Sequence, residues 1–128
     1  MSEPLSIPIA RTSLTPEEIQ SVLGPLESGW LVQGPQVKSF EGKWGDFTGA
    51  PRSLAVTSCT TGMHLAVAGL DLGPGEEVIL PAFTWIATAN VIEHQGATPV
   101  FCDIAPVTFN IDVNQIEGLI TENTVGIL

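Results

Sequence analysis

The stretch Ser53 to Leu70, SLAVTSCTTGMHLAVAGL, constrains the fold of this chain more than any other. An apolar run, Leu54 to Val56, ends in a cluster of small hydroxyl residues, and an amphipathic run follows it. The apolar positions of that second run have the i, i+3, i+4, i+7 spacing of one helix face: Met63, Ala66, Val67 and Leu70. The pattern predicts a strand that turns directly into a helix from about Thr61 to Leu70.

Such a turn is suited to a phosphate group. The first backbone N–H groups of a helix have no partner within the helix, and the helix dipole adds partial positive charge there. The hydroxyl groups of residues 57–61 add further donors. An ordinary serine or threonine N-cap without any ligand is the alternative interpretation.

The sequence before this stretch is mainly helical, and strands and helices alternate after it. Residues 1–13 look extended, and a helix begins at Thr15, with Pro16 at its first position and Pro25 as its end or kink. A loop over 28–35 and a second helix over 37–47 follow.

After Leu70 we predict a strand over 78–80, a helix over 84–96 closed by Gly96, a strand over 98–103, a helix over 111–120, and a strand from 124 onward. In the helix over 111–120 the residues expected to face inward are Val113, Ile116, Leu119 and Ile120. This order is typical of an α/β fold with a largely parallel sheet.

Charge and composition exclude several classes of partner. The formal net charge of −10 argues against nucleic acid and against an anionic membrane, although backbone amides can still bind a phosphate. The apolar runs are shorter than the roughly 20 residues that cross a bilayer, and the N-terminus lacks the features of a signal peptide. We therefore expect a cytoplasmic protein with Cys59 and Cys102 as free thiols. No metal site is expected, because His64 and His94 are also separate in the sequence.

Four segments of the chain, in order, carry a resemblance to a known family: residues 28–41, 57–90, 96–104 and 109–120. Together they resemble the N-terminal portion of the pyridoxal-phosphate-dependent sugar aminotransferases of the DegT/DnrJ/EryC1/StrS family, from about Ile7 to Leu128. The resemblance implies the aspartate-aminotransferase fold, called fold type I. Residues 1–128 would then form the N-terminal segment and the first, incomplete part of its major domain.

The resemblance also implies an activity and partners. Members of this family work as homodimers with active sites at the subunit interface. They transfer an amino group from an amino acid, commonly glutamate, to a keto sugar carried on a nucleotide. The cofactor implied for this chain is pyridoxal 5'-phosphate.

Three cofactor-binding residues follow from the same resemblance. The family's phosphate-binding turn matches residues 58–62, so the backbone amides of Thr60 and Thr61, with a hydroxyl group of either, would hold the cofactor phosphate. Trp85 matches the aromatic residue that stacks on the pyridine ring. Without the resemblance, a core position would be the preferred interpretation of Trp85. We interpret Trp30 and Trp44 as packing residues, and Asp103 as structural.

The chemistry of transamination needs a lysine that forms a Schiff base with the cofactor. The lysines of this chain, Lys38 and Lys43, both precede the phosphate-binding turn and match no family lysine motif. We therefore expect no catalytic residue in the chain and no activity of the chain alone. Two alternatives remain open: a family member that dehydrates the sugar with histidine in place of lysine, and a standalone, non-catalytic module that binds phosphate or a partner subunit.

Leu128 lies inside an apolar run, which is typical of the first part of a longer protein. In fold type I the first strand, here about residues 53–57, has sheet neighbours that come later in the sequence. Leu54 and Val56 would then lack neighbours, and the isolated chain would be poorly stable or prone to aggregate. A self-sufficient domain would instead pair residues 53–57 with residues 78–80 or 99–102.

Overall fold

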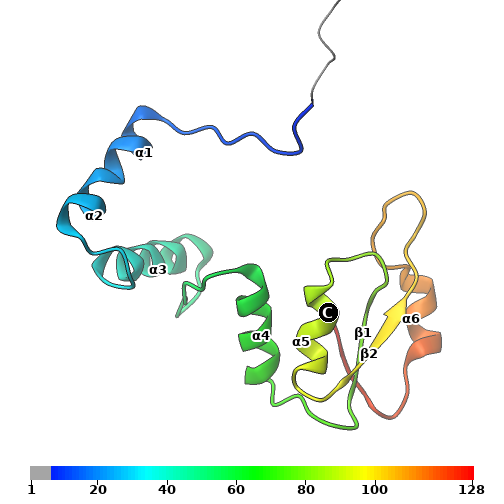
Figure 1. Cartoon of the computed structure of the whole chain (residues 1–128). Helices are drawn as coiled ribbons and strands as arrows, with labels where there is room; N and C mark the ends of the chain where they lie inside the picture. The colour runs from blue at the N-terminus through cyan, green and yellow to red at the C-terminus, as the bar shows by residue number, and fades with distance from the viewer. Residues whose placement is uncertain (1–6) are drawn as a thin grey trace, which may run out of the picture. The chain divides into compact units, whose positions relative to one another are not determined.

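The computed structural model describes residues 7–128, which divide into two compact units (Figure 1). The first lies within Met1–Ala55 and the second is Val56–Leu128. Of the segment expected to be extended, residues 1–6 lie outside the described part, and residues 7–13 form neither helix nor strand. No helix in residues 7–128 is both long and apolar enough to cross a membrane.

The first unit is helical, as the sequence predicts. Its helices are α1 (Pro16–Ser21), α2 (Leu23–Ser28) and α3 (Pro35–Thr48). Thr15 and Glu18 form a reciprocal capping box at the start of α1, in which each side chain accepts the other residue's backbone N–H. The predicted helix is interrupted, but at Val22 rather than at Pro25, which is the third residue of α2. The ring of a proline clashes with the carbonyl group four residues earlier, and here that residue is Ser21, the last of α1.

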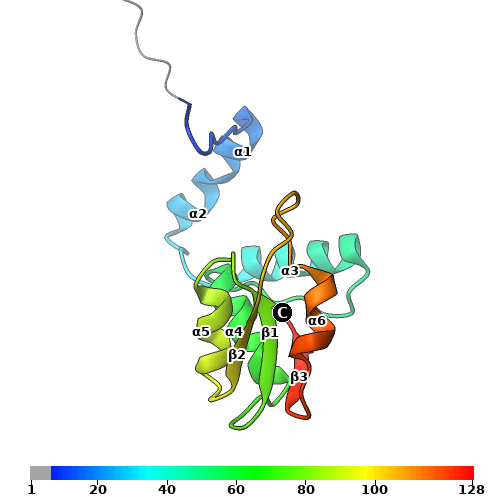
Figure 2. The ribbon, with the colours of Figure 1, turned by 90° about the vertical axis from the view of Figure 1, so that its right-hand side faces the viewer.

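The second unit is a small parallel α/β structure. Its elements, in order, are α4 (Cys59–Gly69), β1 (Glu77–Pro81), α5 (Ala87–Glu93), β2 (Thr98–Cys102), α6 (Val113–Leu119) and β3 (Thr124–Ile127). The strands lie in the order β2-β1-β3, and both pairings are parallel. The connections from β1 to β2 and from β2 to β3 cross the sheet in opposite directions. Two right-handed crossovers therefore place α5 and α6 on opposite faces of the sheet, as Figures 1 and 2 show.

The core of the second unit is built around the central strand. Val78 and Leu80 point to one face of β1 and pack with a cluster from α5 and the start of β2 that contains Ala89, Ile92 and Ala97. Ile79 points to the other face and is also fully buried. A strand that is buried on both faces is typical of parallel sheets, which explains why residues 78–80 are a continuous apolar run.

The prediction for the inner face of α6 is wrong in half of its residues. Ile116 and Leu119 are half-buried, but Val113 and Ile120 are 69% and 56% exposed. The helix is only seven residues long. Val113 is its first residue, and Ile120 has already left the helix with φ −72° and ψ 125°, so neither side chain continues the inward face.

The strand predicted over residues 54–56 is not formed. Both edges of β1 are occupied by β2 and β3, which leaves no edge of 78–80 for residues 53–57. Residues 53–57 form no strand beside 99–102 either, although the outer edge of β2 is open in the described residues. Leu54 remains 69% exposed and Val56 38% exposed. The N–H of Ala55 donates to Glu41 Oε1 at 2.8 Å instead of to a neighbouring strand. A strand needs such a neighbour for its backbone groups, and the local sequence cannot supply one.

We predict a steep difference in backbone protection between these two segments. In the 128-residue chain, the amides of Ile79 and Leu80 should exchange with solvent far more slowly than those of Leu54 and Val56, because only β1 is bonded on both edges. Hydrogen exchange followed by mass spectrometry or NMR measures this. Equal protection of the two segments would show that residues 54–56 belong to a stable sheet in solution.

Candidate functional site at the carboxyl edge of the sheet

The turn before α4 is closed by its own hydroxyl groups. Ser58 is the N-cap, and its Oγ accepts the backbone N–H of Thr61 at 3.1 Å. The Thr61 hydroxyl lies 3.0 Å from Ser58 Oγ and 3.1 Å from Thr57 Oγ1. The N–H of Gly62 donates to the carbonyl of Ser58. These three hydroxyl groups, from Thr57, Ser58 and Thr61, are called the hydroxyl cluster below.

The structure confirms that Thr60 and Thr61 lie at the start of a helix, as its second and third residues. The helix begins at Cys59, two residues before the predicted start, because Ser58 takes the capping position. Among residues 7–128, the N–H groups of Cys59 and Thr60 have no acceptor, whereas that of Thr61 is taken by Ser58. The turn therefore offers two free donors at the positive end of an 11-residue helix.

Trp85 lies in the loop between β1 and α5, and it is 77% exposed. It is therefore not a core residue of this chain. The loop is fixed at both ends. The N–H of Ala82 donates to the carbonyl of Cys102 at 2.8 Å, and the carbonyl of Trp85 accepts the N–H of the buried Thr88 at 2.9 Å. The backbone is thus held while the indole ring stays free to contact a ligand.

The phosphate-suited turn and Trp85 lie at the same edge of the second unit. Helices α4 and α5 pack side by side and run in the same direction (Figure 1). Midway along α4, His64 lies against the end of α5, with its ring centre 5.8 Å from that of His94 and its Nδ1 3.5 Å from Gln95 Nε2. Both helices start at the edge where the parallel strands end, which is where ligands bind in open α/β sheets.

His64 and His94 are far apart in the sequence, but their rings are in contact in the structure. The distance between two residues along the sequence does not predict their distance in space when they lie on helices that pack together. Within the described part of the chain, no group of three or more histidine, cysteine, aspartate or glutamate side chains is arranged to hold a metal ion. Cys59 is exposed, Cys102 is buried, and both are free thiols as predicted.

The edge carries no cationic side chain of its own. All 4 basic residues of the chain precede residue 56, so the second unit has neither lysine nor arginine. An anion at this edge would have to be held by backbone N–H groups, hydroxyl groups and the helix dipole.

Asp103 and Asp112 close the base of the loop between β2 and α6. The Asp103 carboxylate accepts the N–H of Ile104 at 2.7 Å, and its carbonyl accepts the N–H of Asp112, which fits a structural role. Hydrogen bonds from the Gln115 side chain, and then from the backbone and side chain of Asn114, lower the pKa of Asp112. The cap of α6 is therefore complete above the ordinary carboxyl pKa and is lost as the pH falls through the lowered value.

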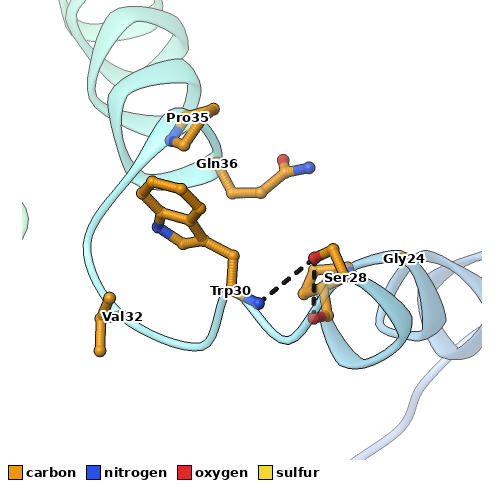
Figure 3. A pocket seen from close by; sticks show the side chains of 7 residues that line it. Gly24, Ser28, Trp30, Val32, Pro35 and Gln36 are labelled. Atoms are coloured by element: carbon orange, nitrogen blue, oxygen red, sulfur yellow. Dashed lines mark hydrogen bonds between the residues drawn. The ribbon is translucent and has the colours of Figure 1, made fainter.

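The first unit contains a separate apolar hollow of about 420 Å³ beside Trp30 (Figure 3). Trp30 Nε1 donates to the carbonyl of Gln33 at 2.9 Å, and a Cβ atom at Gly34 would overlap the indole. Trp44 lies between the rings of Phe40 and Phe47 on α3, with ring centres 6.2 and 5.9 Å away. Both tryptophans contact neighbours within the first unit, but Trp30 remains 59% exposed and Trp44 51% exposed.

Two further residues at the carboxyl edge were not singled out by the sequence pattern. The rings of Phe83 and Phe109 lie with their centres 6.0 Å apart, although the residues come from different loops. Both positions lie inside segments that carry the family resemblance, 57–90 and 109–120, but a phenylalanine there indicates no particular role. Only the φ of +58° at Phe109, which the sequence does not reveal, makes the residue unusual.

Comparisons with known proteins agree on one family. The model of the DegT/DnrJ/EryC1/StrS aminotransferase family matches residues 12–128. The spore coat polysaccharide biosynthesis protein SpsC of Bacillus subtilis is 45% identical over 125 residues, which cover 98% of this chain and 31% of SpsC. The chain thus spans about a third of the length of the relatives it matches.

Solved structures give the same result. A protein of Streptococcus pneumoniae described as a sugar aminotransferase, solved in its PLP form, is 40% identical with a TM-score of 0.85 over 96% of this chain and 31% of its own. A GDP-4-keto-6-deoxymannose-3-dehydratase with a trapped PLP-glutamate geminal diamine is 27% identical, with a TM-score of 0.87 over 95% of this chain and 33% of its own. These neighbours are fold type I enzymes, so the predicted fold class is confirmed.

We predict that Ser58→Ala loosens the start of α4. The substitution removes the acceptor of the Thr61 N–H, which should lower the stability of the second unit by about 1 kcal/mol and speed amide exchange at Thr61. Urea unfolding and hydrogen exchange measure the two effects. Ser58→Asn is the matched control, because asparagine also caps helices and should retain most of the stability. An alanine variant indistinguishable from the parent chain would show that the cap does not hold the turn.

Proposed function

Because the chain belongs to the DegT/DnrJ/EryC1/StrS aminotransferase family, we propose that it supplies the phosphate-binding turn and the ring-stacking residue of a pyridoxal-phosphate-dependent, sugar-modifying enzyme. One observation carries this proposal: the start of α4 and the loop between β1 and α5, which contains the exposed Trp85, lie at the same edge of the sheet (Figure 1). The proposal depends on groups that belong to this chain: the free backbone N–H groups at the start of α4 and the indole ring of Trp85.

Each residue has a definite part in this proposal. The free N–H groups of Cys59 and Thr60 would donate to the phosphate of the cofactor, and the dipole of α4 would stabilise its charge. Thr61 would join them when the phosphate replaces Ser58 Oγ as the acceptor of its N–H. The hydroxyl groups of the cluster can then turn and donate, since hydroxyl groups act as donors as well as acceptors.

Trp85 would supply the apolar wall of the site. A flat, electron-poor pyridine ring against an indole face is favoured by about 1 kcal/mol beyond the area buried. When bound, pyridoxal phosphate supplies an electron sink for chemistry at the carbon that carries the amino group. In this proposal the residues of this chain bind and orient the cofactor. A residue that forms the Schiff base would have to lie in a part of the protein that corresponds to the remaining two thirds of the relatives.

We extend the proposal to the transfer of an amino group from an amino acid, with glutamate favoured, to a keto sugar carried on a nucleotide. The enzyme would be a cytoplasmic homodimer. The similar proteins support a sugar substrate: one is described as a sugar aminotransferase, and SpsC is a spore coat polysaccharide biosynthesis protein. Dehydration of the sugar is the second candidate, favoured by the likeness to the dehydratase.

Replacement of Trp85 by alanine should weaken cofactor binding. Loss of the stacking face should cost about 1–2 kcal/mol, which is roughly a five- to thirtyfold rise in Kd. Titration of the chain with pyridoxine 5'-phosphate isolates this contact, because the probe has the ring and the phosphate but no aldehyde to react with Lys38 or Lys43. Val107→Ala, an exposed apolar residue of the neighbouring loop, is the control. An unchanged Kd in the Trp85 variant would contradict a stacking role.

The 128-residue chain alone should not transaminate. Lys38 and Lys43 both lie on α3, in the first unit, and neither matches the lysine motif of the family. An assay with pyridoxal phosphate, glutamate and a nucleotide-linked keto sugar should show no amino sugar. Turnover above that of free pyridoxal phosphate would contradict the proposal that this chain binds the cofactor but lacks the residue that forms the Schiff base.

A further inference from the structure

The contact between Phe83 and Phe109 is not part of the hydrophobic core. The two phenylalanines are 68% and 59% exposed, and neither belongs to the cluster around Val78 and Leu80. Their rings nevertheless meet, with centres 6.0 Å apart and planes tilted by 50°. This is a favourable arrangement for an aromatic pair. Two large rings that meet at the surface hold their loops together without filling a core.

Phe109 reaches this contact with an unusual backbone. Its φ of +58° lies in the left-handed region, which a bulky residue rarely adopts. The hairpin of residues 104–111 enforces the conformation. The N–H of Phe109 donates to the carbonyl of Ala105, the N–H of Ala105 donates to the carbonyl of Asn110, and Ile104 bridges Ile111. Strained backbones of this kind persist where the surrounding structure fixes them.

Phe83 connects that hairpin to the Trp85 loop. It lies between Ala82, which is bonded to the carbonyl of Cys102, and Trp85, whose carbonyl accepts the N–H of Thr88. These bonds fix the two ends of the loop, and Phe83 lies between them. Its contact with Phe109 therefore restrains the middle of the loop from the neighbouring hairpin.

We infer that Phe109 is a positioning residue, which braces the Trp85 loop through Phe83 and so fixes the indole for stacking on a flat heterocyclic ring. The effect on ligand binding rests on the role proposed above for Trp85. The bracing itself rests only on the ring contact, the closed hairpin and the two anchored ends of the loop.

The test is Phe109→Asn in the full 128-residue chain. Asparagine accepts a left-handed backbone, so the variant removes the ring without adding strain. Amide exchange over residues 83–86 should become about two- to tenfold faster, and the Kd for pyridoxine 5'-phosphate should rise by a similar factor. Phe109→Tyr keeps the ring and should restore both values. Val107→Ala, on the same hairpin and 89% exposed, should change neither.

A second variant covers the case in which Phe109→Asn disturbs the hairpin. Phe83→Ala removes the other ring and leaves residues 104–111 intact, so it should produce the same change. If the contact braces the loop, the Phe83→Ala, Phe109→Asn double variant should show less than the combined effect of the two single variants. Additive effects, or unchanged exchange over 83–86 in both single variants, would overturn the inference.

The same measurements separate this inference from the proposed function. Faster exchange and a higher Kd in Phe109→Asn, with a higher Kd in Trp85→Ala, support both. Faster exchange in Phe109→Asn with an unchanged Kd in Trp85→Ala supports the bracing and contradicts the stacking role. A higher Kd in Trp85→Ala with unchanged exchange in the Phe109 and Phe83 variants leaves the proposed function standing and refutes the bracing.

Discussion

Strand β1 is hydrogen-bonded to a parallel neighbour along each of its edges, and this pairing determines where the rest of the second unit can go. Parallel neighbours require crossover connections, and right-handed crossovers carry each helix back so that it starts beside the end of a strand. The turn before α4, the loop with Trp85 and the hairpin of residues 104–111 consequently gather at one edge. The candidate site is thus a product of topology, since none of its parts is near another in the sequence.

At the start of α4, the cap and the proposed phosphate site share one backbone donor, the N–H of Thr61. Ser58 Oγ holds the Thr61 N–H when nothing else does, and the hydroxyl groups of Thr57 and Thr61 complete the cluster. The second unit contains no lysine or arginine, so in the proposed site an anion would rely on the free N–H groups of Cys59 and Thr60 and on the Thr61 N–H once Ser58 releases it. A helix start that is stable without a ligand and can exchange its acceptor suits a cofactor that binds reversibly.

The local sequence predicts those elements whose cause is local. The run at 78–80 becomes β1 because a central parallel strand is apolar on both faces. The break between α1 and α2 falls at Val22, within one turn before Pro25, because a proline disfavours a continuous helix over the residues that precede it. The run at 54–56 is equally apolar but forms no strand, because a strand forms there only when another strand lies beside it. The approach of His64 to His94 and of Phe83 to Phe109 depends on packing between distant segments. The local pattern marks residues 57–61 as a turn suited to a phosphate, whereas Trp85 could be singled out only through the family resemblance.

The strand order also has a consequence for the time course of folding. As the chain leaves the ribosome, β1 meets β2 after a single short crossover, whereas β3 follows only after α6. Throughout that interval one edge of β1 and the face that carries Ile79 stay open, so the nascent chain exposes an apolar strand edge of the kind that drives misassembly. Synthesis rate and chaperone access during this interval, rather than final stability alone, would then govern the yield of folded protein.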